Sequence, residues 1–166
     1  TQQNHTILHK VCERGNRKLV ETVISSMYAS HLKALMLHRD QYGNTPLHKA
    51  SQSSSKDRAS VIVALLKIIP AQLLCEQLTY VNHVKVDVVH CIIKSSGLLN
   101  DILGHLQQQD KFLLMKARNL SDDTVLHRIM APDDNQRNLI AQLKAIKGAL
   151  NPAHFIELLK LKGKYG

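Results

Sequence analysis

Four short segments of the chain share one pattern: a capping residue stands three positions before a histidine, and an apolar residue stands two positions after it. The segments are T-I-L-H-K-V at 6–11, T-P-L-H-K-A at 45–50, D-V-V-H-C-I at 87–92 and T-V-L-H-R-I at 124–129. The four histidines are 39, 42 and 37 residues apart. A period of this length is typical of proteins in which one supersecondary unit stacks on the next. We therefore expect a row of similar units.

The first residue of each copy predicts the start of a helix. It is Thr6, Thr45, Asp87 or Thr124. Threonine and aspartate are preferred N-cap residues, because their side-chain oxygen accepts a hydrogen bond from a backbone N–H in the first turn. Pro46 follows at the first helical position, where a missing N–H costs nothing. The histidine then falls at the end of the first turn.

Two further helices are expected in each unit. After a polar break, a second segment with apolar periodicity occupies 17–27, 58–69, 98–108 and 137–150. A third segment is headed by Ser30, Pro70, Asp110 or Asn151. This order predicts an all-α fold of about four units of 37–42 residues, each with two antiparallel helices and a short extra helix. The expected single domain has units at 1–39, 40–81, 82–118 and 119–162, and 163–166 opens a further one.

The composition bounds the class of protein. Hydrophobic residues make up 44% of the chain and aromatic residues 4%, so the core is expected to be aliphatic. The three cysteines are Cys12, Cys75 and Cys91, an odd number without C-x-x-C spacing. They indicate a reducing compartment and no disulfide framework, and we expect a cytoplasmic protein. No apolar stretch reaches the roughly 18 residues of a membrane span.

The net charge of +9 raises nucleic acid and anionic membranes as partners. The excess is spread along the chain. No aromatic residues are interleaved as stacking platforms for bases with the nearest basic clusters, which are Arg14, Arg17 and Lys18, and Lys160, Lys162 and Lys164. Solvated positive faces account for it better. Nucleic acid and membranes are therefore disfavoured as partners, although the charge alone does not rule them out.

Ten histidines suggest a metal site, and the spacing argues against one. Equivalent residues on stacked helices lie roughly 8–10 Å apart, whereas zinc needs each nitrogen at about 2.0–2.1 Å. The rings of His9, His48, His90 and His127 are instead expected to bond backbone groups of their own or a neighbouring turn. We expect no metal and no cofactor.

A catalytic site is also not expected. Cys12 follows His9 by three and Cys91 follows His90 directly, but these cysteines lie on apolar helix faces, where a small buried thiol is the ordinary occupant. Glycine-rich phosphate loops are absent from the sequence. The pairs Asp122-Asp123 and Asp133-Asp134 are interpreted as helix-terminal charge and turn residues. The chain is therefore predicted not to be an enzyme.

The stretch D-Q-Y-G-N-T-P-L-H-K-A at 40–50 resembles the ankyrin repeat signature. The residues in register are Asp40, Gly43, Thr45, Pro46, Leu47, His48 and Ala50. The third copy departs from the pattern with Asn82, Lys85, Asp87 and Val88, and the fourth has Asn119 and Asp122 at the Asp and Gly places. The units exceed the family's usual length of about 33 residues, which we attribute to the third helix.

The resemblance implies an ankyrin-type solenoid that binds another protein through a concave face of turn tips and first helices. Residues carried over as structural are Thr6, His9, Gly43, Thr45, Pro46, Leu47, His48, Asp87, His90, Thr124 and His127. Residues carried over as partner-binding are His5, Glu13, Arg14, Gln41, Tyr42, Asn44, Gln52, Ser53, His83, Val84, Val86, Lys94, Leu120, Ser121 and Asp123. Tyr42 is the expected anchor, because aromatic residues and arginines dominate protein interfaces.

An alternative function stays open at this point. The chain is expected to be a fragment of a longer protein, because G-K-Y-G at 163–166 lines up with D-Q-Y-G at 40–43. It would then serve as a targeting or autoregulatory module of a larger enzyme, for example a secreted bacterial effector acting in the host cytosol. The divergent units and the composition rich in Lys, Gln, His and Leu suggest this alternative.

Overall fold

The computed structural model describes residues 4–70, 73, 74, 77, 78, 80–83, 87–89, 93, 98–118, 122–130 and 139–163. Within these residues every regular element is a helix, which confirms the all-α class. Several residues singled out above lie outside the described part of the chain: Cys75, Val84, Lys85, Val86, His90, Cys91, Lys94, Asn119, Leu120, Ser121, Asp133 and Asp134.

Three helices form the N-terminal part of the chain. They are α1 (Ile7–Arg14), α2 (Arg17–Ser25) and α3 (Ala29–Leu37). Thr6 is the N-cap of α1, and Gly15 ends that helix in the left-handed conformation at φ 62°. Asn16 then caps α2 by accepting a hydrogen bond from the Leu19 N–H at 3.1 Å. The two-residue break between α1 and α2 thus follows from one glycine and one asparagine.

The later helices follow the same order along the chain. They are α4 (Pro46–Gln52), α5 (Arg58–Leu66), α8 (Leu98–His105), α9 (Gln108–Lys116), α10 (Val125–Met130), α11 (Leu139–Ala149) and α12 (Pro152–Leu159). Two predicted starts are wrong. Helix α3 begins one residue before Ser30 and α9 two residues before Asp110, and neither helix has a side-chain N-cap bond. Asn151, by contrast, caps α12 as predicted.

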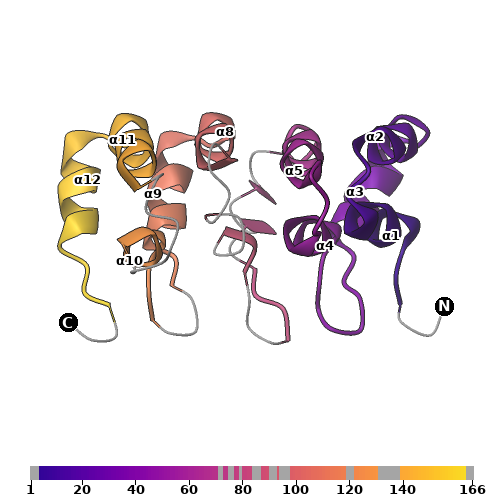
Figure 1. The fold of residues 1–166 in the computed structure, drawn as a ribbon, viewed down its shortest axis with the longest axis horizontal. Coiled ribbons are helices and arrows are strands. Elements are labelled where there is room, and N and C mark those ends of the chain that lie inside the picture. The colour runs from indigo at the N-terminus through magenta and orange to yellow at the C-terminus, as the bar shows by residue number, and fades with distance from the viewer. Residues whose placement is uncertain are drawn as a thin grey trace.

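The helices stand in a row from one end of the molecule to the other (Figure 1). Helices α2, α5, α8 and α11 lie along the upper edge of that view, with α1, α4 and α10 below them. Neighbours pack in sequence: α1 against α4, α2 against α5, α5 against α8, and α8 against α11. No described helix is both long enough and apolar enough to cross a bilayer.

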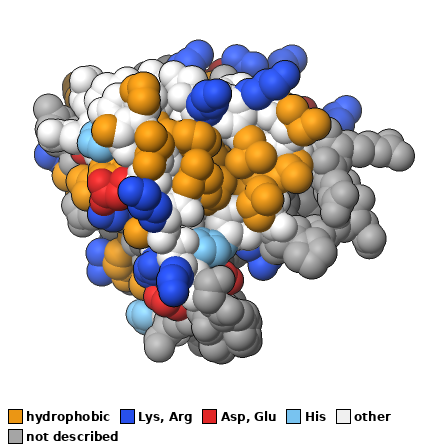
Figure 2. Space-filling model, turned by 90° about the vertical axis from the view of Figure 1, so that its left-hand side faces the viewer, with side chains coloured by type: hydrophobic (Ala, Val, Ile, Leu, Met, Phe, Trp, Pro, Cys, Tyr) orange, Lys and Arg blue, Asp and Glu red, His pale blue; other side chains and the backbone are white. Residues whose placement is uncertain are grey.

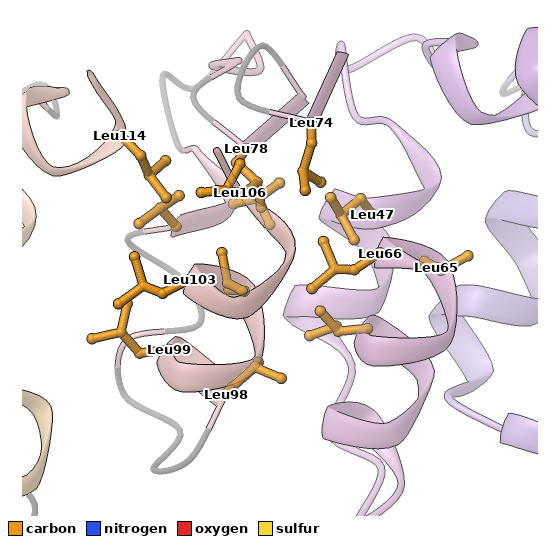
Figure 3. Packing of buried hydrophobic residues seen from close by; sticks show 14 of the residues in the cluster. Leu47, Leu65, Leu66, Leu74, Leu78, Leu98, Leu99, Leu103, Leu106 and Leu114 are labelled. Carbon is orange, nitrogen blue, oxygen red and sulfur yellow. The ribbon is translucent and has the colours of Figure 1, made fainter. Parts of the chain in front are cut away.

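The core follows the row as one cluster of aliphatic side chains. In Figure 3, Leu47 and Leu66 point toward helix α8, which carries Leu98 and Leu103, and Leu74 lies above the space between them. All five side chains are at most 2% exposed. Each fully buried leucine stabilises the fold by about 1.5–3 kcal/mol, so the contact between successive helix pairs is held by leucine packing.

Tight turns precede the first helix of the later units. Asp40 N–H donates to the Asn44 carbonyl at 2.9 Å, and Gly43 N–H donates to the Asp40 carbonyl at 3.0 Å. Isolated bridges join Val81 to Asp87 and Arg118 to Thr124 in the next two turns. The segments that contain these turns extend below the helices in Figure 1. The turn tips are therefore gathered on one side of the row.

Candidate functional site

Thr45 and His48 bond each other reciprocally at the start of α4. Thr45 Oγ1 accepts a hydrogen bond from the His48 N–H at 3.4 Å. In return, His48 Nδ1 lies 3.3 Å from the Thr45 N–H and 2.9 Å from Thr45 Oγ1. This is a capping box in which histidine takes the place of the usual Glu or Gln. The predicted helix cap at Thr45 is confirmed.

The same box occurs at two other copies of the motif. Thr6 Oγ1 lies 2.8 Å from His9 Nδ1, and Thr124 Oγ1 lies 2.7 Å from His127 Nδ1. In both pairs the threonine N–H also faces Nδ1, and the histidine N–H faces Oγ1. The same spacing of three residues between threonine and histidine thus gives the same local geometry at three places in the chain.

The other ring nitrogen reaches a turn more than 30 residues further along the chain. His9 Nε2 lies 2.9 Å from the carbonyl oxygen of Asn44, and His48 Nε2 lies 3.1 Å from that of Tyr80. A carbonyl accepts only, so Nε2 carries the proton. Nδ1 accepts from a threonine N–H, so it must be unprotonated. Both rings are therefore neutral Nε2–H tautomers.

This arrangement indicates a structural role for His9 and His48. Both rings belong to fully buried residues, and each of their nitrogens is engaged by protein groups. Burial lowers the pKa of His9, and the hydrogen bond to Asn44 opposes that shift only in part. A ring held in this way has no free lone pair for a metal or a substrate proton. His9 and His48 thus join α1 and α4 to turns further along the chain.

Asp40 is the centre of a buried network in the turn before α4. Its Oδ1 accepts hydrogen bonds from the N–H groups of Tyr42 and Asn44, each at 2.8 Å. Its Oδ2 lies 3.0 Å from His5 Nε2, 3.2 Å from Asn44 Nδ2 and 3.3 Å from Lys49 Nζ. Burial alone would raise the pKa of Asp40, but the hydrogen bonds from Asn44, Tyr42 and Lys49 lower the pKa to about 2. The carboxylate therefore stays ionised and fixes the turn.

Asn44 and Ser53, which were expected to bind a partner, are buried, and the side chain of half-buried His5 is nearly inaccessible. Asn44 is 5% exposed, because its side chain bonds Asp40 and accepts from Asn82 Nδ2 at 2.8 Å. The His5 side chain is 3% exposed, since it pairs with Asp40. Ser53 is 7% exposed and accepts from the Ser55 N–H at 3.2 Å. These three side chains are therefore not exposed on the surface of the turn.

The remaining described members of the predicted set are accessible. Gln41, Tyr42, His83, Glu13, Arg14 and Gln52 are exposed, and Asp123 is half-buried. The structure brings Tyr42 and His83 together: the His83 N–H donates to the Tyr42 carbonyl at 2.9 Å. The His83 ring also lies against Gly43, where a β-carbon would come within 2.8 Å of its Cδ2. We call Gln41, Tyr42 and His83 the tip surface.

Sequence reasoning missed a cation–π pair beside these turns. The Arg39 guanidinium carbon lies 3.7 Å from the centre of the Tyr80 ring. Arg39 is exposed and Tyr80 is half-buried. The sequence does carry a signal for a role of these arginines in the turns, because Arg39 and Arg118 both stand six residues before a capping threonine. Arg118 is likewise used in a turn, where it donates to the Lys162 carbonyl at 2.9 Å.

Comparison with known proteins does not assign the chain to a family. No family model, curated protein or solved structure matches this chain. The resemblance to ankyrin repeats therefore rests on the motif residues alone.

Neither a metal centre nor an active cysteine emerges from the described residues. They contain no group of three His, Cys, Asp or Glu side chains arranged to hold a metal ion. Cys12 is fully buried, and burial raises the pKa of its thiol to about 12. A thiol at that pKa is protonated at neutral pH and is a poor nucleophile. Cys12 is thus a core residue.

Proposed function

We propose that the chain is a divergent ankyrin-type solenoid that binds another protein through its tip surface. The observation that carries the proposal is the pairing of exposed Tyr42 with exposed His83 on adjacent turns. The capping boxes at Thr6, Thr45 and Thr124 support the repeat assignment. The threonines and histidines of the motif are engaged in helix caps and in hydrogen bonds between turns. The exposed residues of the turn tips are then the ones available to contact a partner.

The chemistry of the tip surface suits protein recognition. Tyr42 is 50% exposed, although its N–H donates to Asp40 and its carbonyl accepts from the His83 N–H. Aromatic residues and arginines carry most of the binding energy at protein interfaces. Tyr42 supplies such an aromatic ring, and the Arg39–Tyr80 pair supplies a second on the same two turns.

The buried network beneath the tip surface prepares it for binding. Asp40 and Asn44 hold the turn, and Asn82 ties it to the following one. A surface that is already ordered loses less conformational freedom on association. The binding residues are therefore presented on a rigid base, and their substitution leaves that base intact.

Photo-crosslinking from the turn tests the proposal. A photoreactive amino acid at Gln41 is expected to capture a protein that the same group at Tyr28 does not capture. Tyr28 is the N-cap residue of α3, is 80% exposed and serves as the matched position. The captured protein is then titrated against purified variants. Tyr42→Ala should weaken binding at least about tenfold, in line with an interface anchor, whereas Tyr28→Ala should leave it unchanged.

Two results would count against this function. Equal binding by the Tyr42→Ala and wild-type proteins, with equal melting temperatures, would remove the tip surface. A steep loss of affinity with salt, with a slope of several counterions, would indicate a nucleic-acid partner instead. Binding through Tyr42 predicts a shallow salt slope.

A further inference from the structure

A groove of about 510 Å³ runs between α2 and α5. These helices pack against each other along the upper edge of Figure 1, on the side of the row opposite the turn tips. Helix α2 contributes Arg17, Glu21 and Ile24 to the lining, and the other side is formed by α5 together with Lys67 and Ile68, which follow it. We call this the α2–α5 groove.

The α2–α5 groove lies inside the row. All of its lining residues belong to the stretch 4–70, which the structure describes without a gap. Its two walls come from units that already pack against each other, and α5 also packs against α8. The groove is therefore a lateral surface between two neighbouring units, and it is not a face on which a further unit stacks.

Both walls start at the same end of the groove. The Ser55 hydroxyl, in the break before α5, donates to the carbonyl of Gly15, in the break before α2, at 2.9 Å. Each helix has nine residues, which gives a groove about 13 Å long. Arg17 is the first residue of α2, whereas Lys67 is the C-cap of α5. The two basic side chains thus stand at opposite ends of the groove.

The floor of the groove is apolar. Ile24, Val63 and Ile68 line it, and each is half-buried because part of its side chain packs against the core. Ser60 also lines the groove, but its hydroxyl donates to the Asp57 carbonyl at 2.8 Å. The floor therefore presents apolar surface whose removal from water favours association.

Positive charge brackets this floor. Arg17 Nε donates to Glu21 Oε1 at 2.7 Å, which leaves the terminal guanidinium nitrogens to bind a second carboxylate. Lys67 is exposed and takes part in none of the salt bridges among the described residues. Basic side chains also stand along the upper edge of the molecule in Figure 2. The charge of the groove thus favours an occupant with a carboxylate near each end.

A second copy of this chain does not supply that pattern. Each described helix holds at most one Asp or Glu, whereas the occupant needs two on one face of a single helix. Two copies with a net charge of +9 would also repel each other. The occupant is therefore sought in a different protein.

We propose that the α2–α5 groove binds an amphipathic helix of a separate partner protein, with acidic residues at both ends of its apolar stripe. Residues i and i+7 lie on one face of a helix and about 10 Å apart along it. Carboxylates at these positions meet Arg17 and Lys67, and apolar anchors at i+3 and i+4 pack on Val63 and its neighbours. The groove is separate from the tip surface, so the two binding sites can be tested independently.

A pair of synthetic peptides tests the chemistry. The probe is an amphipathic peptide of about 14 residues, four turns of helix, with two glutamates seven residues apart and leucines at the two middle positions between them. The control peptide carries lysines in place of the glutamates. In fluorescence anisotropy titrations with the full chain, the glutamate peptide should bind at least about tenfold more tightly than the lysine peptide.

Matched variants locate the binding. Ala59→Tyr fills the groove at an exposed position and should weaken the glutamate peptide at least about tenfold. Ala34→Tyr makes the same change at an exposed position of α3 outside the groove and should have no effect. Lys67→Glu should weaken the same peptide at least about threefold, whereas Lys33→Glu, on α3, should not.

Reversal of the charge pattern gives a second readout. The double variant Arg17→Glu, Lys67→Glu should select the lysine peptide over the glutamate peptide. Tyr42→Ala should leave the binding of both peptides unchanged, because it alters the tip surface only. Circular dichroism spectra that match the wild type show that each variant is folded.

Three outcomes would overturn the proposal. Failure of the glutamate peptide to bind more tightly than the lysine peptide, or equal effects of Ala59→Tyr and Ala34→Tyr, would show that the groove does not select an acidic helix. A concentration-dependent dimer in sedimentation that Ala59→Tyr abolishes would assign the groove to a second copy. Cosedimentation of the chain with phosphatidylserine vesicles, lost in Ala59→Tyr, would assign it to a membrane.

Discussion

The His9 ring joins two turns of the chain: its Nε2–H donates to the carbonyl of Asn44, 35 residues further on, at 2.9 Å. Its Nδ1 meanwhile closes the capping box with Thr6. One side chain therefore closes the N-terminal cap of α1 and joins that helix to the turn at Asn44. His48 repeats the arrangement with Thr45 and the carbonyl of Tyr80. We therefore expect the stability of the row to depend on these two Thr–His pairs.

Removal of the Thr45 hydroxyl should destabilise the fold. Thr45→Val keeps the volume but loses the bonds to the His48 N–H and Nδ1. We expect the free energy of unfolding to fall by about 1–2 kcal/mol, the usual range for a lost cap. Urea unfolding measures the change. Thr45→Ser retains the hydroxyl and should cost less; equal losses would show that the hydroxyl is not what stabilises the turn.

Two glycines should respond to alanine with opposite signs. Gly43 has a φ of 76°, and a β-carbon there would meet the His83 ring at 2.8 Å and its backbone nitrogen at 3.1 Å. Gly43→Ala should therefore lower the free energy of unfolding by more than about 1 kcal/mol. Gly148 lies in α11 with nothing within 4 Å. Gly148→Ala should raise stability by roughly 0.5–1 kcal/mol, and a matching loss at both glycines would contradict this account.

Stability should decline as the pH falls below neutrality, because of His9. Burial lowers its pKa in the folded state below the ordinary 6.5, so the unfolded chain binds the proton first. The contribution of His9 is complete above pH 6.5 and is lost as the pH falls toward the folded pKa. His9→Gln should reduce the slope of unfolding free energy against pH in this window by up to one proton. An unchanged slope would exclude His9 as the titrating group.

A second acid window should come from Asp40. Its pKa falls from 3.8 to about 2 on folding, so its contribution is complete above pH 3.8 and is lost between pH 3.8 and about 2. Asp40→Asn should be less stable at pH 7 but should show a flatter profile in that window. Urea titrations at several pH values give both quantities. A wild-type profile that is already flat between these limits would contradict the proposed network.

The Cys12 thiol should resist alkylation until the chain unfolds. Burial raises its pKa to about 12, so little thiolate exists at pH 8 and the reagent has no access. Iodoacetamide labelling followed by peptide mass spectrometry separates Cys12 from Cys75 and Cys91. Labelling of Cys12 should rise with urea along the unfolding curve. Labelling in the native protein at the rate of a free thiol would show that α1 is open.

Local spacing was sufficient to predict the helix starts at Thr6 and Thr45. A cap needs only its own residue and the first helical turn, and both are visible in the sequence. The buried positions of Asn44, His5 and Ser53 could not be read in the same way, because each is set by a partner in another turn. The error at these positions came from treating every polar turn residue as solvent-exposed.

The repeat pattern also could not predict which residues are exposed in the last described unit. Met130 occupies the same motif place as buried Cys12 and Ser51, and only the structure shows that it is 55% exposed. The starts of α3 and α9 were misplaced because Ser30 and Asp110 look like caps, whereas both lie in the first helical turn.

Nitrogen NMR of the imidazole rings tests the central claim most directly. If His9 and His48 join their helices to later turns, long-range ¹H–¹⁵N spectra should show both as neutral Nε2–H tautomers at pH 7. A coupling through the hydrogen bond should connect His9 Nε2 with the Asn44 carbonyl carbon. Thr6→Val should change the Nδ1 shift of His9 and leave that of His48 unchanged. An Nδ1–H tautomer at either ring, or a His9 ring that titrates with the pKa of a free imidazole, would contradict the account.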